Sequence, residues 1–218
     1  MKIREEFHCF SCLIIFNMKP ILFILLFVSI AVSKDIKVFH FTDIHAELDY
    51  EMGKPAVCVE GPCCRIDSVA KNESYAAPRY GDHHCDNAPD FIQDSFDFFA
   101  RYFEENPDKK PDYILMTGDQ ATHRKKSTQS AELNIKLVRY VFETYKKYFG
   151  QYSTIPVFGN HDTFPEGHML LPPENKWMTE VMADLWKDWV PMDQMDTIIY
   201  GGYYTMTVCI IIYIILII

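Results

Sequence analysis

Carboxylate, amide and imidazole side chains follow three short apolar runs in this sequence, each at the point where the run ends. The three segments are Asp43-Ile44-His45, Gly118-Asp119 and Gly159-Asn160-His161-Asp162. Carboxylate oxygens and neutral imidazoles are ligands that suit zinc, manganese or iron, and no thiolate lies in these segments. The pattern predicts a two-metal site, in which the ions lie about 3.5–4 Å apart.

The residue types favour different roles at such a site. Asp43 and His45, which are separated by one residue, can bind one ion together. Asp119 comes from the central segment and is the natural bridge between two ions. Asn160 can offer a carbonyl oxygen to the second ion without adding negative charge. His161 is then expected to face the substrate as a cation or proton donor rather than to bind metal.

Strands and helices are expected to alternate around these segments. The apolar runs at residues 37–42, 113–117 and 155–158 have the length and composition of buried strands. Residues 90–106 and 130–149 carry apolar side chains at helical spacing, with Asp90 placed to cap the first helix and Gly150 to end the second. A third helix is expected over residues 174–190.

This order of elements predicts an α/β fold. A strand–helix–strand–helix–strand order implies parallel strands joined by right-handed crossovers. In an open α/β sheet, ligands bind outside the carboxyl ends of the strands, so the three segments should meet there. We expect the helix aromatics to form the core and His40 to lie on a face of the sheet.

Together the motifs resemble the calcineurin-like metallophosphoesterases and, more narrowly, the acid sphingomyelinase-like phosphodiesterases. The wider resemblance rests on the three segments above. The narrower one rests on Phe41-Thr42-Asp43-Ile44-His45, Cys58 with Cys63-Cys64, Tyr80-Gly81-Asp82 before Cys85-Asp86, His123 four residues after Asp119, and Gly201-Gly202-Tyr203-Tyr204. The resemblance covers about residues 37–207. Thr122 stands where a purple acid phosphatase would have tyrosine, which argues against an iron–tyrosinate site.

The resemblance implies hydrolysis of a phosphodiester by a metal-activated water at two zinc ions. It places His123 near the phosphate, where His123 and His161 would protonate the leaving alkoxide. The implied substrate is a sphingomyelin-type lipid or a nucleotide-type diester. The implied fold is the N-terminal half of a four-layer α/β/β/α sandwich with one exposed sheet face. A monomer that can contact a membrane surface is expected.

An apolar run near the N-terminus predicts secretion. Residues 20–33 end in Ala31-Val32-Ser33, the pattern of a signal peptide and its cleavage site. The run is shorter than the roughly 20 residues that cross a bilayer. We therefore expect residues 1–33 to be a signal peptide, with residues 1–17 an upstream extension of the gene model, and the protein to be extracellular or lysosomal. An uncleaved signal anchor is the alternative.

Four cysteines lie in the long excursion between the first expected strand and helix: Cys58, Cys63, Cys64 and Cys85. In a secreted chain, disulfides are the default interpretation, and bridge geometry disfavours a bond between adjacent cysteines. A zinc-binding cysteine cluster is the alternative, without a C-x-x-C pair here to support it. The resemblance implies the pairs Cys58–Cys63 and Cys64–Cys85.

The same excursion carries Asn72-Glu73-Ser74, a sequon that predicts glycosylation of Asn72. It also carries His83 and His84, which we expect at the surface beside a disulfide. The net charge of −9 argues against binding of a nucleic-acid polymer, because phosphate backbones require basic patches.

The last residues raise an alternative function. The resembled family completes its metal site with later histidines, and no histidine follows His168 in this sequence. Residues 34–207 would then be an incomplete phosphoesterase domain. Residues 208–218 would be a hydrophobic tail that is too short to cross a bilayer, and their composition is typical of a gene-model artefact. The alternative to a phosphodiesterase is a truncated, non-catalytic fragment of the family.

Overall fold

The computed structural model describes residues 35–125, 127–168 and 172–206. The expected signal peptide, residues 1–33, and the expected tail, residues 208–218, lie outside these described residues. Among the helices of the described residues, none combines the length and the apolar character that a membrane span requires.

A parallel sheet brings the three segments to a common edge. Its strands are β1 (Val38–Phe41), β2 (Tyr113–Met116) and β3 (Thr154–Pro156), in the order β1-β2-β3. Both pairs of neighbouring strands are parallel, and Phe41 lies opposite Met116 in the register. The predicted order and direction of the strands are confirmed, and so is the α/β fold class.

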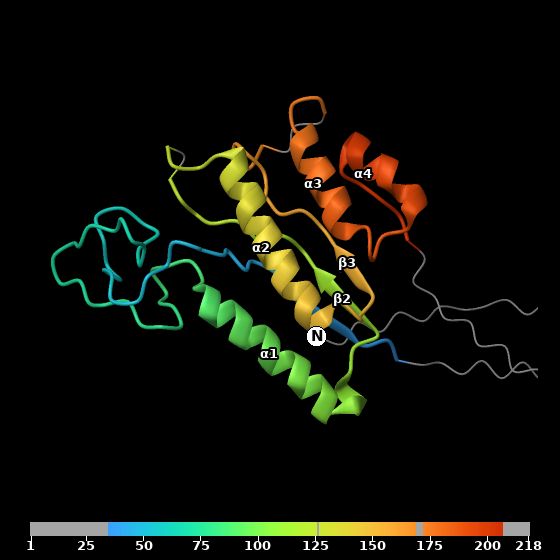
Figure 1. The fold of residues 1–218 in the computed structure, drawn as a ribbon, viewed down its shortest axis with the longest axis horizontal. Coiled ribbons are helices and arrows are strands. Elements are labelled where there is room, and N and C mark those ends of the chain that lie inside the picture. Colours follow the sequence, from blue (N-terminus) through green and yellow to red (C-terminus); the bar gives the residue numbers. More distant parts are fainter. Residues whose placement is uncertain (1–34, 126, 169–171, 207–218) are drawn as a thin grey trace, which may run out of the picture. The chain divides into compact units, whose positions relative to one another are not determined.

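Two helices connect the strands and cover one face of the sheet (Figure 1). They are α1 (Pro89–Glu105) and α2 (Ala131–Phe149). The ring of Phe39 lies 4.9 Å from that of Phe99 on α1 and 6.4 Å from that of Phe149 on α2, measured between centroids. Aromatic side chains of both helices therefore form the core, as expected, and bury the apolar surface that stabilises the sheet.

The two helices are capped differently at their N-termini. Ser130 caps α2, because its hydroxyl oxygen accepts a backbone hydrogen bond from the first turn. The expected cap of α1 is wrong. Ala88 occupies the N-cap position and Pro89 begins the helix, where its fixed φ suits the first turn. Asp90 lies within that turn, and its carboxylate is 2.7 Å from the guanidinium Nε of Arg79.

The C-terminal part differs more from expectation. Helix α3 (Lys176–Trp186) is shorter than the predicted 174–190, and α4 (Met195–Gly201) was not predicted. The backbone N–H groups of Trp189 and Val190 both donate to the carbonyl of Trp186, which closes a turn before Pro191. Within the part of the chain that the structure describes, the remaining elements are two 3₁₀ helices, η1 (Pro107–Lys109) and η2 (Met192–Gln194).

The second face of the sheet is partly open in the described part of the chain. Val38 on β1 is 54% exposed. His40, which was expected on a sheet face, lies on the same face and is exposed. Val157 was predicted to lie in a buried strand, and this is wrong, because β3 ends at Pro156 and Val157 is 44% exposed.

Candidate metal centre

Backbone hydrogen bonds continue past the ends of β1 and β2 and hold the first two segments side by side. The N–H of Asp43 donates to the carbonyl of Gly118 at 3.1 Å, and the N–H of His45 donates to the carbonyl of Asp119 at 3.0 Å. These bonds fix the first predicted ligand pair next to the predicted bridging carboxylate.

The segments have an uncommon backbone conformation. The φ angles of Asp43, His45 and Asp119 are 57°, 41° and 58°, in the left-handed region that few non-glycine residues adopt. Such conformations cost free energy and persist only where the surrounding structure enforces them, often at functional sites.

Two glycines allow the second and third segments to approach each other. A Cβ atom on Gly159 would overlap the backbone nitrogen and the Oδ1 atom of Asp119. A Cβ atom on Gly118 would overlap the backbone nitrogen of Gly159, and the φ of Gly118 is 91°. The two Gly positions in the motifs are therefore required by close approach of backbone to backbone.

His45 presents one ring nitrogen to two carboxylates. Its Nδ1 lies 2.7 Å from the carbonyl oxygen of Ala121, so Nδ1–H donates and Nε2 keeps its lone pair. Nε2 lies 3.6 Å from Asp43 Oδ1 and 4.0 Å from Asp119 Oδ2. Ligand atoms of Asp43, His45 and Asp119 all lie within 4.8 Å of one another. This donor set fits a divalent metal ion.

A buried carboxylate ties the second segment to the third. Asp162 is 1% exposed, and it accepts backbone hydrogen bonds from Asp119 at 3.1 Å, Gln120 at 2.8 Å and Gly159 at 2.9 Å. Burial raises the pKa of Asp162 to about 6, although these hydrogen bonds oppose the shift. Sequence reasoning included Asp162 in a motif but gave it no role.

His161 lies where the segments meet. Its backbone N–H donates to Asp119 Oδ1 at 2.8 Å, and its ring Nε2 is 3.4 Å from Glu166 Oε1. Burial, together with the neighbouring His123, lowers the pKa of His161. Asn160, the residue before it, is exposed, and its predicted role as a metal ligand stays a prediction.

His123 is held by a buried aspartate. Asp86 Oδ1 lies 2.7 Å from His123 Nδ1, and Asp86 Oδ2 accepts the backbone N–H of His123 at 2.7 Å. The hydrogen bond from Asp86 raises the pKa of His123. Sequence reasoning missed Asp86 as a site residue. Asp86 follows Cys85 directly and belongs to one of the motifs that carry the family resemblance, and this position could have indicated a role at the site.

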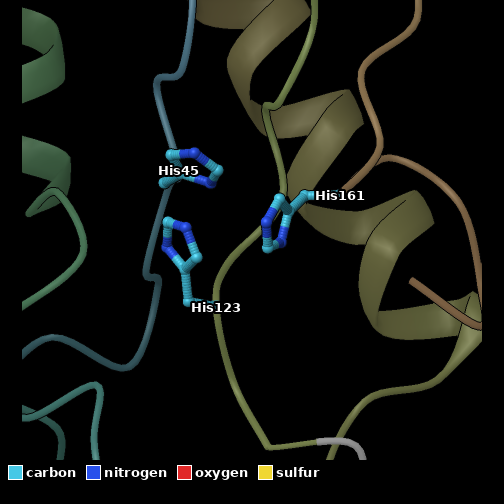
Figure 2. Close-up of side chains that lie close together, drawn as sticks. All are labelled: His45, His123 and His161. Carbon is cyan, nitrogen blue, oxygen red and sulfur yellow. The ribbon is translucent and has the colours of Figure 1, made fainter. Parts of the chain in front are cut away.

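Three histidines from separate segments converge at this place (Figure 2). The ring centroids of His45 and His123 are 3.8 Å apart, and those of His123 and His161 are 4.3 Å apart. The structure therefore places both predicted acids, His123 and His161, beside the predicted ligand His45.

A network of buried charges, which the sequence analysis did not predict, lies next to His123 in the chain and centres on Glu47. Glu47 is fully buried and accepts a hydrogen bond from Arg124 Nε at 2.8 Å. The Thr122 hydroxyl, which donates to Asp86, lies 3.1 Å from the Glu47 carboxylate. Arg65 Nε lies 4.0 Å from the same carboxylate. These charges join the long loop after β1 to the segment after β2.

The disulfide pairing Cys58–Cys63 and Cys64–Cys85 is confirmed. Both bridges lie in the long loop between β1 and α1, drawn in cyan and green in Figure 1. Asn72 is exposed in a turn of this loop, where a glycan has room, and its glycosylation stays a prediction.

The chain is similar to known proteins over most of its length. The calcineurin-like phosphoesterase family model matches residues 36–211. The chain is 33% identical over 179 residues to sphingomyelin phosphodiesterase B of Dictyostelium discoideum. That match covers 81% of this chain and 27% of the Dictyostelium protein. It is 29% identical over 183 residues to sphingomyelinase phosphodiesterase C of the same organism, covering 83% and 39%.

A further relative is cyclic GMP-AMP phosphodiesterase SMPDL3A of Homo sapiens, 27% identical over 172 residues. That match covers 78% of this chain and 35% of the human protein. The chain thus spans between about a quarter and two fifths of the length of these curated relatives.

Proposed function

This chain belongs to the calcineurin-like phosphoesterase family, and we propose that it is part of a secreted, zinc-dependent phosphodiesterase of the acid sphingomyelinase-like group. In this proposal, residues 34–207 are a portion of the phosphoesterase domain and follow a signal peptide of residues 1–33. The observation that carries the proposal is the convergence of Asp43, His45 and Asp119 at the carboxyl ends of parallel strands.

The residues that would hold the ions are Asp43, His45, Asp119 and Asn160. When bound, two zinc ions would stabilise negative charge on the phosphoryl group and lower the pKa of a water molecule. His45 supports this role because Ala121 fixes its tautomer with the lone pair on Nε2. Asp119 supports it because one oxygen is oriented by the N–H of His161 while the other faces His45.

Two histidines would serve the leaving group. Asp86 fixes the proton on Nδ1 of His123 and favours the charged ring, so that Nε2 can hold the proton that the leaving alkoxide needs. His161 lies beside it, with a lowered pKa and a hydrogen bond that ties its backbone to Asp119. His161 would donate a hydrogen bond to the phosphoryl group or share the proton transfer.

The substrate class follows from the relatives. Two of them are named as enzymes of sphingomyelin and one as an enzyme of cyclic GMP-AMP. We therefore propose a phosphodiester of lipid or nucleotide type. The purified chain should be loaded with zinc, assayed for bound metal, and incubated with sphingomyelin vesicles, a cyclic dinucleotide and bis(4-nitrophenyl) phosphate. Hydrolysis of one class but not the other would identify the substrate.

The site assignment is tested by His161→Ala. We expect turnover to fall by about 10²–10⁴-fold, the usual contribution of a proton-transfer group, while zinc content stays unchanged. His168→Ala is the control, since this exposed histidine lies on the same loop. Unchanged turnover in His161→Ala would refute the assignment. Absence of hydrolysis by a zinc-loaded, folded chain would instead favour the non-catalytic alternative.

Secretion is tested separately. The apolar run of residues 20–33 and the two disulfides support an extracellular or lysosomal location. Expression in a eukaryotic secretory host should release protein into the medium with an N-terminus close to Lys34. Retention of residues 20–33 on cell-associated protein would favour the signal anchor.

A further inference from the structure

We propose that Asp82, His83 and His84 form a second metal-binding site, which takes a divalent transition-metal ion of the zinc or copper type. One ligand atom from each of these residues lies within 4.8 Å of the other two. The cluster lies in the disulfide-bonded loop and shares no residue with the candidate metal centre. The inference therefore does not rest on the proposed function.

Both imidazoles face the same carboxylate oxygen. His84 Nδ1 lies 2.9 Å from Asp82 Oδ1, and His83 Nδ1 lies 3.5 Å from the same atom. The two rings are in contact, with centroids 3.8 Å apart. Two protonated rings at this distance would repel each other, whereas a bound cation draws two neutral imidazoles and a carboxylate together.

The carboxylate is held in place by contacts other than the two rings. The Tyr75 hydroxyl donates to Asp82 Oδ2 at 2.8 Å, and the backbone N–H of His84 donates to Oδ1 at 3.0 Å. The Asp82 side chain is only 10% exposed. Its position is thus fixed before an ion arrives, which lowers the ordering cost of binding.

The backbone of the cluster is also fixed. Cys85 N–H donates to the carbonyl of Asp82 at 2.9 Å, and Cys63 N–H donates to the carbonyl of His84 at 3.2 Å. Cys85 is itself bonded to Cys64. The histidine side chains remain open to solvent, at 77% for His83 and 42% for His84, so an ion can reach them.

The donor set decides which ions fit. Two imidazoles and one carboxylate suit Zn²⁺, Ni²⁺ and Cu²⁺, and the expected order of affinity places Cu²⁺ above Zn²⁺. Ca²⁺ and Mg²⁺ prefer sets made of oxygen atoms. A metal ion binds an imidazole nitrogen that carries no proton, so binding should weaken as the pH falls.

Zinc titration of the purified chain tests the site. The double variant His83→Ala/His84→Ala should bind one equivalent of zinc fewer than the unchanged protein. Tyr75→Phe should keep that equivalent but bind it about tenfold or more weakly, as for loss of a group that orients a ligand. His168→Ala, the matched control, should bind as the unchanged protein does. Equal stoichiometry and affinity in the double variant would overturn the proposal.

A second measurement needs no variant. Diethyl pyrocarbonate modifies accessible neutral histidines, and the modified positions can be read by peptide mass spectrometry. Zinc should slow modification of His83 and His84 but leave His168 unchanged. Equal rates of modification of His83 and His84 with and without zinc would refute the site. Because this experiment uses the unchanged protein, its result does not depend on whether the variants fold.

Discussion

Asp162 accepts the backbone N–H of Asp119 at 3.1 Å, across 43 residues of sequence. With two further N–H donors, Gln120 and Gly159, it fixes the loop after β2 against the loop after β3. The proposed bridging ligand therefore owes its position to a residue that does not itself need to touch a metal.

Replacement of this carboxylate should destabilise the fold. In Asp162→Asn one oxygen becomes an NH₂ group that faces backbone donors, so at least one buried hydrogen bond is lost. We expect the free energy of unfolding to fall by about 2–4 kcal/mol, measured by urea denaturation at neutral pH. Asp97→Asn is the control, since its carboxylate pairs with Arg101 at the surface and should matter by less than about 1 kcal/mol. Equal effects of the two variants would contradict the role of Asp162.

The close approach of the two glycines predicts a second effect. Gly159→Ala should displace Asp119, because the new Cβ overlaps its backbone nitrogen and carboxylate. We expect a loss of about 1–3 kcal/mol in unfolding free energy and weaker zinc binding. Gly61→Ala is the control, because its Cβ would have no neighbour within 4 Å. Zinc binding should be measured by competition with a chromogenic chelator, and an unchanged affinity in Gly159→Ala would contradict the prediction.

The Asp86–His123 pair predicts a pH dependence of stability in metal-free protein. Burial opposes the charged form of Asp86, but hydrogen bonds from His123 and Thr122 hold its pKa below the ordinary 3.8. Its stabilising contribution is therefore lost as the pH falls through the lowered pKa. The pKa of His123 is raised above 6.5, so its contribution is present below 6.5 and is lost as the pH rises through the raised value.

The pair should thus stabilise the fold most between about pH 4 and 6.5. In chelator, the difference in unfolding free energy between unchanged protein and Asp86→Asn should be largest there and smaller at pH 8. If this difference in unfolding free energy instead grew steadily toward pH 8, the prediction would be wrong. In a preparation that turns over substrate, the same variant should lower kcat by about 10–100-fold and keep its zinc.

The two disulfides should differ in their effect on stability. Cys64–Cys85 spans 21 residues and Cys58–Cys63 spans 5. Because cross-links that close longer loops restrict the unfolded chain more, Cys64→Ala/Cys85→Ala should cost ~3 kcal/mol and Cys58→Ala/Cys63→Ala ~2 kcal/mol. Thermal and urea unfolding of the two double variants measure this, and the reverse order would show that native packing, rather than loop closure, dominates.

Several features follow from the sequence because they depend on local patterns. The period of the apolar residues predicts α1 and α2, and the run-then-loop pattern predicts where Asp43, Asp119 and His161 lie. The alternation of strand and helix predicts a parallel sheet, because short right-handed crossovers permit few other topologies. Errors at this level lie at element ends, where Ala88 rather than Asp90 caps α1 and β3 ends before Val157, and in the short helix α4, which was not predicted.

The internal geometry of the site was decided only by the tertiary structure. Periodicity says which face a side chain takes, but it cannot say how three loops that follow separate strands will turn. Asp86 reaches His123, and Glu47 reaches Arg124, only because the long loop folds back beside the segment after β2. These contacts join residues that are far apart in sequence, and they form only after the loops have folded. No local sequence pattern encodes them.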